Sequence, residues 1–392
     1  MTNATPLPRY FLGLWAVYPL LVPFYLMGKT PVPGTAKVEG GVPQIADYYL
    51  LGLMGLVFTT LPFRLSRAAV APVAALAGFV IYTAFVNLTW ATALEDLSLL
   101  KSTLFYAYDG LLLLTCLVLY AHFQDAFLRV TIAAVAGSVV LQAVLSPLAI
   151  VPGIPRQALF FNDENQLGYF CLLAGTVFAL GTRRFAMPVR HQAIFYVALA
   201  YLALLSQSRG ALLGLAVLIV VALLDRPVRL LCVVGGACAV LAVLTLAPLS
   251  VSKSEERYIV GSEYDTPAAR GYDRIVNYPE HVLLGAGEGA YARFRSDLYA
   301  TELHSTYGTL LFCYGIPGTT LFTLGLLLLC KRDPRVALFL IPALVHGLGH
   351  QGMRFAFVWA MLAFVGACAI RSAAATPPDV APDASAAWEP AP

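Results

Sequence analysis

Arginines and one histidine stand at the ends of apolar segments, and they are the residues best suited to chemistry in this chain. Arg209 lies in a connection of only a few residues, and His304, two residues after Glu302, stands directly before an apolar run. An arginine presents a planar fork of donors that matches phosphate oxygens, and an imidazole can take up a proton near neutral pH. This pattern predicts a site for a lipid headgroup or diphosphate, with His304 orienting or deprotonating a hydroxyl group.

Further arginines belong to the same part of the chain. Arg156 precedes an apolar run, and a polar segment from about Ser250 to Leu303 carries Arg257, Arg270, Arg274, Arg293 and Arg295. An interfacial arginine can instead snorkel to water or pair with a carboxylate such as Glu263 or Asp265. We favour this anchoring role for Arg257, Arg274, Arg293 and Arg295. Arg209 differs, because its short connection holds it close to two helix ends.

Two polar motifs accompany these arginines. Asn162, Asp163, Asn165 and Gln166 lead into an apolar run. Helix capping by Asn162 or Asp163 explains one of them, and the others suit sugar hydroxyls. The Gly285-Ala-Gly-Glu-Gly289 run superficially resembles a nucleotide loop, but no strand–helix unit surrounds it, and we reject that interpretation.

The elements that must position these residues are membrane helices. Hydrophobic residues make up 59% of the 392 residues and charged residues 12%, against about 25% charged residues in soluble domains. We therefore predict an all-α polytopic membrane protein, whose helices cross a hydrocarbon layer of about 30 Å. The expected spans are 10–27, 46–63, 68–88, 102–121, 127–151, 165–182, 190–206, 210–225, 229–249, 305–330, 335–350 and 354–371.

Basic residues concentrate in alternate short connections, which predicts the orientation. Both termini are expected in the cytoplasm, and Arg156, Arg209 and His304 outside it. The expected organisation is helices 1–9 in 1–249, a large periplasmic loop in 250–304, helices 10–12 in 305–371 and a disordered cytoplasmic tail in 372–392. The first span lacks a small-residue cleavage site, so we expect an uncleaved anchor.

Several function classes are disfavoured. The seven cysteines all fall in expected spans, which predicts no disulfide framework and no zinc site. A net charge of +3 is too small to indicate nucleic acid as a partner. Asp109, His346 and His350 lie inside expected spans, where ionisable groups suggest function. A proton relay or a metal site is conceivable for the two histidines at i,i+4, but we favour a structural polar network.

The order of the motifs resembles a known family. Arg156…Phe161-Asn-Asp-Glu-Asn165, Ser208-Arg-Gly210, Arg270 followed by Gly285-Ala-Gly-Glu-Gly289, and His304-Ser-Thr-Tyr…Gly315-Ile-Pro-Gly318 resemble elements of the bacterial O-antigen ligase and polymerase superfamily. The resemblance covers roughly residues 150–330. Ser305 departs from it, because the family often has Asn there. The Asn-Asp-Glu-Asn-Gln stretch is more similar to exopolysaccharide polymerases than to lipopolysaccharide ligases.

The resemblance implies an enzyme of the bacterial inner membrane, with about twelve helices and a site facing the periplasm. Such enzymes are metal-independent inverting glycosyltransferases that need no cofactor. They transfer a glycan from an undecaprenyl-diphosphate carrier to lipid A core or to a growing glycan, with membrane lipids around them. His304 and Arg209 would be catalytic. The expected substrate-binding residues are Arg156, Arg270, Asn162, Asn165 and Glu302.

Three alternatives stay open from the sequence. Within the class, a polymerase of repeat units, a ligase and a protein glycosyltransferase share donor chemistry. A transporter for a polyprenyl-linked sugar would show internal repeats with paired broken helices, and we find none. A structural membrane scaffold would tolerate lysine in place of the arginines.

Overall fold

The structure is a computed structural model that describes residues 9–26, 43–154, 156–225, 267, 270–294 and 302–375. Within these ranges the chain forms helices and connecting loops and no strand, so the expected all-α class is confirmed there. The expected span 229–249, most of the polar loop before residue 270, and the tail beyond residue 375 lie outside the described residues. Arg257, Arg295, Glu263 and Asp265 lie outside them as well.

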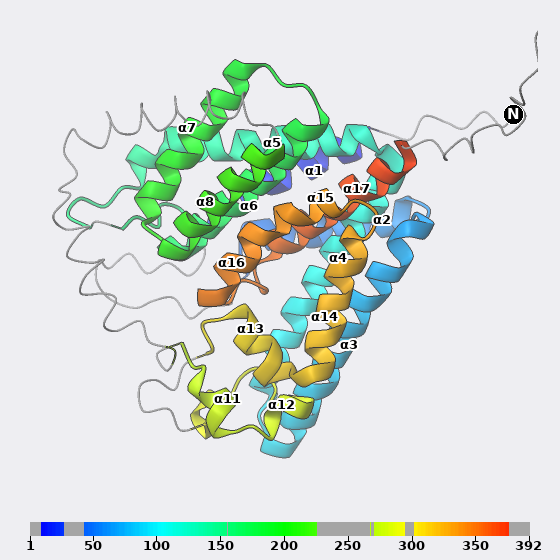
Figure 1. The fold of residues 1–392 in the computed structure, drawn as a ribbon, viewed down its shortest axis with the longest axis vertical. Coiled ribbons are helices and arrows are strands. Elements are labelled where there is room, and N and C mark those ends of the chain that lie inside the picture. The colour runs from blue at the N-terminus through cyan, green and yellow to red at the C-terminus, as the bar shows by residue number, and fades with distance from the viewer. Residues whose placement is uncertain are drawn as a thin grey trace, which may run out of the picture.

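Helices coincide with every expected apolar run that falls in the described ranges (Figure 1). The long helices are α1 (Tyr10–Leu21), α2 (Ile45–Thr60), α3 (Arg67–Leu94), α4 (Leu100–Phe123), α5 (Asp125–Leu145), α6 (Glu164–Arg184), α7 (Val189–Ser206), α8 (Arg209–Asp225), α14 (Tyr314–Cys330), α16 (Ile341–Gly349) and α17 (Ala356–Ala375). Short helices are α11 (Asp273–Asn277), α12 (His281–Leu284), α13 (Thr306–Gly308) and α15 (Pro334–Ala337).

Among the described residues, five helical segments are long and apolar enough to cross a membrane. They are Arg67–Leu94, Leu97–Phe123, Asp125–Leu148, Val189–Ser206 and Thr306–Cys330. Together with the composition, they indicate a membrane protein.

Helix packing divides the described chain into two neighbouring groups. In one, α14 packs on α3, and α17 packs on α4. In the other, α6 packs against both α7 and α8, and every residue from Leu167 to Gly181 is buried. α16 contacts α8 of the second group and also α13. It therefore connects the second group with the segment α11–α13, which lies below α16 in Figure 1.

The expected span over 305–330 coincides with the apolar segment Thr306–Cys330, but its helix is interrupted. A π-helical turn, Thr309–Cys313, precedes Gly315, whose φ of 62° and ψ of −168° are not helical. A Cβ atom at Gly315 would lie 2.7 Å from the carbonyl oxygen of Leu283, and one at Gly285 would lie 2.4 Å from that of Cys313. Two backbone segments therefore cross without intervening side chains, which only glycine allows at these positive φ angles.

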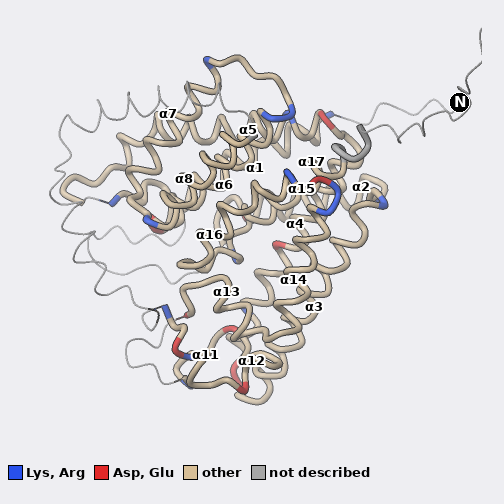
Figure 2. Tube along the Cα trace, in the orientation of Figure 1, with Lys and Arg blue, Asp and Glu red and all other residues tan. Residues whose placement is uncertain are grey.

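Charged residues gather at helix ends and around α11–α13, while the long helices are mostly uncharged (Figure 2). At the C-terminal end of α6, Arg183 pairs with Asp333 at 3.6 Å and Arg184 with Asp125 at 3.5 Å. The opposite end of α6 carries the polar motif of Asp163 and Asn165. Polar contacts therefore lie at both ends of α6, while its middle is buried.

Candidate functional site

The N-terminal end of α6 brings Arg156 and Asn165 together. The Asp163 carboxylate caps the helix, because its Oδ1 accepts from the backbone N–H groups of Asn165 at 2.7 Å and Gln166 at 2.9 Å. Burial raises the pKa of Asp163, while these two N–H groups oppose the shift. Arg156 donates to Asn165 Oδ1 at 2.7 Å and pairs with Glu164 at 2.5 Å. Asn162 is partly buried next to this cap.

The turn between α7 and α8 adjoins Arg156. The Nε atom of Arg156 donates to the carbonyl oxygen of Ser206 at 3.4 Å, three residues before Arg209. Gln207 adopts a left-handed conformation that ends α7, and the buried Ser208 follows it. Arg209 begins α8 and is partly buried. Its charge therefore adds to the positive end of the helix dipole, and the structure places Arg156 and Arg209 on neighbouring segments.

Arg270 and His304 form a second group. The backbone N–H of His304 donates to the carbonyl oxygen of Arg270 at 3.1 Å, and the His304 side chain is exposed. The Arg270 guanidinium donates to the carbonyl oxygen of Gly349, at the end of α16. Ser305 caps α13 by accepting from the backbone N–H of Gly308 at 3.2 Å. A hydroxyl here therefore performs a local structural role.

Residues Gly349 and His350 connect the two groups. The carbonyl oxygen of His350 accepts from Thr306, both from the backbone N–H at 3.2 Å and from Oγ1 at 3.1 Å. The first turn of α8 lies against the same residue, since a Cβ at Gly210 would lie 2.9 Å from His350 Cδ2. The α8 end that carries Arg209, the Arg270 side chain and the His304 segment therefore meet at the end of α16.

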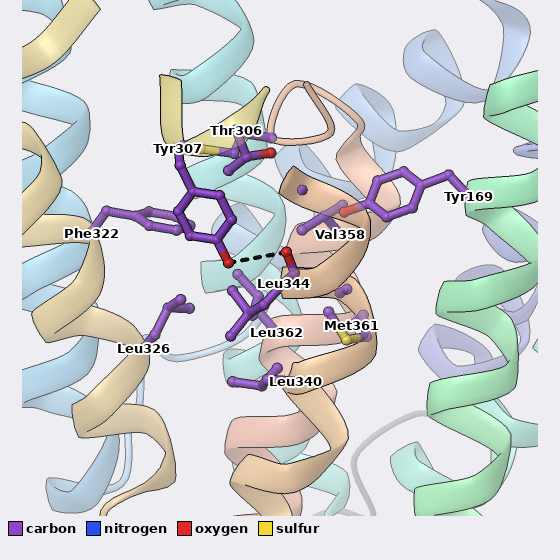
Figure 3. A pocket seen from close by; sticks show the side chains of 13 residues that line it. Tyr169, Thr306, Tyr307, Phe322, Leu326, Leu340, Leu344, Val358, Met361 and Leu362 are labelled. Atoms are coloured by element: carbon purple, nitrogen blue, oxygen red, sulfur yellow. Dashed lines mark hydrogen bonds between the residues drawn. The ribbon is translucent and has the colours of Figure 1, made fainter. Parts of the chain in front are cut away.

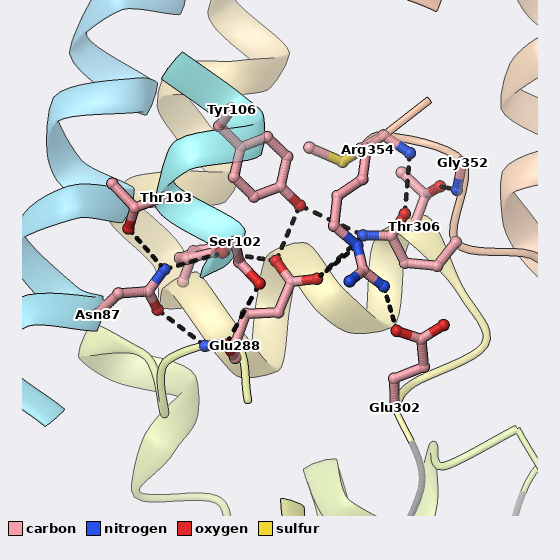
Figure 4. Close-up of polar contacts among 12 residues, drawn as sticks. Asn87, Ser102, Thr103, Tyr106, Glu288, Glu302, Thr306, Gly352 and Arg354 are labelled. Carbon is pink, nitrogen blue, oxygen red and sulfur yellow. Dashed lines mark hydrogen bonds and ion pairs between the residues drawn. The ribbon is translucent and has the colours of Figure 1, made fainter. Parts of the chain in front are cut away.

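A buried carboxylate lies beside this meeting point (Figure 4). Glu288, of the Gly285–Gly289 run, is 2% exposed. Its Oε2 accepts from the hydroxyl groups of Tyr106 at 2.9 Å and Tyr314 at 2.6 Å. Its Oε1 accepts from Gln351 at 3.2 Å and pairs with Arg354 Nε at 3.2 Å. Four donors thus satisfy one carboxylate away from water, as a buried charge requires.

The backbone around Glu288 is held as well. Its N–H donates to Asn87 Oδ1 at 2.8 Å, and Asn87 Nδ2 donates to Thr103 Oγ1 at 3.0 Å. The Gly285–Gly289 run is thereby inserted between α3, α4 and α14. The run is a structural insertion into the helical core.

Arg354 extends the network to Glu302. Its Nη2 donates to the carboxylate of Glu302, whose side chain is 38% exposed. Glu302 was expected to bind substrate, and the structure shows its carboxylate engaged with Arg354, two residues before His304. Glu302 therefore ties the His304 segment to the buried Glu288.

Two of the expected interfacial arginines pack on aromatic rings instead. Arg274 is 1% exposed and lies over the Tyr291 ring at 5.2 Å. Arg293 lies over Trp90 at 4.7 Å and donates to the carbonyl oxygen of Ala286. The side chain of Arg274 therefore does not snorkel to water, because the segment that carries it packs against the helices.

The sequence interpretation missed Glu288 and Arg354, and it assigned His346 and His350 to a structural network. The only signal for Glu288 was a single carboxylate in a glycine-rich run. Its partners come from α4, α14 and the 351–354 segment, so no local spacing could identify them. His346 is 2% exposed, and neither ring nitrogen has a hydrogen-bond partner among the described residues. Asp109 is buried in α4, where its Oδ2 likewise lacks a partner within the described ranges.

An apolar pocket adjoins α13 (Figure 3). Tyr307, whose hydroxyl donates to the carbonyl oxygen of Leu344 at 3.0 Å, stands at its polar end next to Thr306. Its walls come mainly from α14, α16 and α17, including Phe322, Leu326, Ala343, Met361 and Leu362. The lining is therefore predominantly apolar.

The described residues contain no group of three His, Cys, Asp or Glu side chains placed to hold a metal ion. Five cysteines of the described ranges are free and buried: Cys116, Cys171, Cys313, Cys330 and Cys368.

Comparison with known proteins adds no assignment. No family model matches the chain, and no curated protein matches it in sequence.

Proposed function

We propose that this protein is a membrane glycosyltransferase that moves a glycan from an undecaprenyl-diphosphate carrier to an acceptor hydroxyl. In this proposal the chain crosses the bacterial inner membrane twelve times, and the site faces the periplasm. The observation that carries the proposal is the meeting of the Arg209 end of α8, the Arg270 side chain and the His304 segment at Gly349 and His350. The motif order shared with O-antigen ligases and polymerases supports the same assignment.

The arginines suit the leaving group. A glycan leaves the carrier as its anomeric C–O bond breaks and negative charge develops on the diphosphate. Preorganised guanidinium groups stabilise such charge effectively where water is excluded. Arg209 adds its charge to the N-terminal end of α8, and Arg270 is held at the neighbouring end of α16. Arg156 already pairs with Glu164 and Asn165, so we assign it the outer wall of the donor site.

His304 suits the acceptor. Its side chain is exposed, while its backbone is bonded to Arg270. The acceptor oxygen would attack the anomeric carbon from the face opposite the diphosphate, and the hydroxyl proton would pass to the imidazole. One bond forms and one breaks at the same carbon, so the configuration inverts. The acceptor is lipid A core for a ligase or a growing glycan for a polymerase.

The apolar pocket suits the carrier. It begins at Thr306 and Tyr307, two and three residues after His304, and continues along α14, α16 and α17. An isoprenoid chain placed there would enter from the lipid and leave its diphosphate near the arginines.

Product analysis tests the proposal. The purified protein is mixed with an undecaprenyl-diphosphate oligosaccharide and, in separate reactions, with lipid A core, with a second donor molecule or with a peptide. Ladders of lipid-linked product would assign a polymerase, and one glycan added to lipid A core or peptide would assign a ligase. Arg209→Ala and His304→Ala proteins serve as variants, with Gly13→Ala as a control, because nothing lies within 4 Å of a Cβ at Gly13.

Two results would refute the proposal. Full transfer by both folded variants would remove the assigned roles of Arg209 and His304. Donor that crosses vesicle membranes without any modified acceptor would replace the enzyme by a transporter.

A further inference from the structure

Three aromatic rings form a stack that runs from α6 to the end of α16. The rings of Tyr169 and His346 lie 4.1 Å apart at an angle of 8°, and those of His346 and His350 lie 4.7 Å apart at 22°. The i,i+4 spacing places both imidazoles on one face of the helix, so each ring covers the next. The stack ends at Gly210, the residue after Arg209.

Contact between His350 and α8 is close. A Cβ built on Gly210 would lie 2.9 Å from His350 Cδ2 and 3.2 Å from its Nε2, and 3.3 Å from His346 Cδ2. Contacts under 3.0 Å require a shift of one partner, so Gly210 permits an approach that alanine would not. The Tyr169 ring behind His346 is itself packed against Gly352, where a Cβ would lie 2.5 Å from the Tyr169 ring. The three stacked rings are therefore packed closely at both ends, by Gly210 and by Gly352.

The backbone of His350 contacts the segment that follows His304. Thr306 donates twice to the carbonyl oxygen of His350. The Arg270 guanidinium donates to the carbonyl oxygen of Gly349. The carbonyl oxygen of Arg270 accepts from the backbone N–H of His304. His350 thus contacts α8 through its ring and the His304 segment through its carbonyl group.

We infer that His350 is a positioning residue, whose ring sets the place of the Arg209 end of α8 and whose backbone sets that of the His304 segment. This inference rests on the proposed function, because it concerns the distance between the donor and acceptor groups of that site. This role requires a planar ring at position 350 that stacks on the His346 ring. It requires no proton transfer by the His350 imidazole.

Four variants and one ligand test the inference. Gly210→Ala, His350→Ala, the double variant and His350→Phe are purified as full chains, with Gly13→Ala as the matched control. Two quantities are measured: the thermal unfolding midpoint without ligand, and the dissociation constant for undecaprenyl diphosphate that carries no glycan.

We expect Gly210→Ala to weaken binding of undecaprenyl diphosphate about tenfold, because an added methyl group displaces the packed end of α8. His350→Ala should weaken it by a similar factor, and adding Gly210→Ala should then cost no more than about twofold, since the obstructing ring is gone. His350→Phe should stay within about threefold of the wild-type protein, since phenylalanine keeps the flat ring. The unfolding midpoints should show the same non-additivity.

Each contrary result has a distinct meaning. Equal losses from Gly210→Ala in both backgrounds, in the midpoint or in binding, would overturn the inferred contact. Wild-type affinity in His350→Ala, or the same loss in His350→Phe as in His350→Ala, would overturn the positioning role. Absence of binding by the wild-type protein would refute the proposed function instead, while the thermal cycle, which needs no ligand, would still decide the contact.

Discussion

Replacing Arg354 by glutamine is the most discriminating test of the buried network. Glu288 has a side-chain exposure of 1%, and Arg354 of 27%. Removing one partner of a buried ion pair costs about 3–5 kcal/mol, because the other charge stays buried without compensation. Glu288 would keep its two tyrosine donors and Gln351. We therefore expect the low end of this range, about 3 kcal/mol in the free energy of unfolding.

The contribution of the Arg354–Glu302 pair to stability can be measured separately from that of the Arg354–Glu288 pair. Glu302 is 38% exposed, and solvent-exposed ion pairs contribute only about 0–1 kcal/mol. Glu302→Gln is accordingly the matched control, because it keeps the Glu288–Arg354 pair intact. The free energy of unfolding is measured by denaturant titration in detergent micelles for both variants.

A double variant completes the experiment. Glu288→Gln combined with Arg354→Gln removes both charges, and it should be less destabilised than the sum of the two single variants. A loss below about 1 kcal/mol in Arg354→Gln would contradict the reasoning, since a buried unpaired carboxylate could not be so well tolerated.

Three further predictions concern neighbouring residues. Tyr314→Phe removes the 2.6 Å donor to Glu288, so it should lower the free energy of unfolding by about 1–3 kcal/mol in the same titration; no loss would mean that this bond is dispensable. Gly315→Ala should prevent stable folding, because φ is 62° and the new Cβ would lie 2.7 Å from the carbonyl oxygen of Leu283. The yield of detergent-extracted protein and its unfolding midpoint measure this, and wild-type values would refute the crossing of the two segments. Burial lowers the pKa of His281, while Glu280 raises it. His281 therefore binds a proton more readily in the unfolded protein than in the folded protein. The unfolding midpoint should consequently fall as the pH drops below about 6.5. His281→Phe should reduce that fall, and an identical pH profile in both proteins would contradict the assignment.

The helices were predictable because their signal is local. Apolar runs separated by polar residues coincide with helices throughout the described ranges, and the cap of α6 by Asp163 follows from the residue type and its place before the apolar run. The candidate site was predictable in part for the same reason. Arg209 and His304 stand at helix ends, which the sequence shows without tertiary contacts.

The tertiary structure decided which of these residues meet and which groups satisfy each other. Glu288 takes its partners from α4, α14 and the segment after α16, so its burial could not follow from any window of the sequence. The break at Gly315 depends on a backbone from some thirty residues earlier in the chain, which makes the close approach possible. His346 and His350 share a helix face by spacing alone, but only the packing of α16 on α8 places them against Gly210. Helix formation depends on residues three and four apart, whereas the partners of a buried charge depend on how the helices pack.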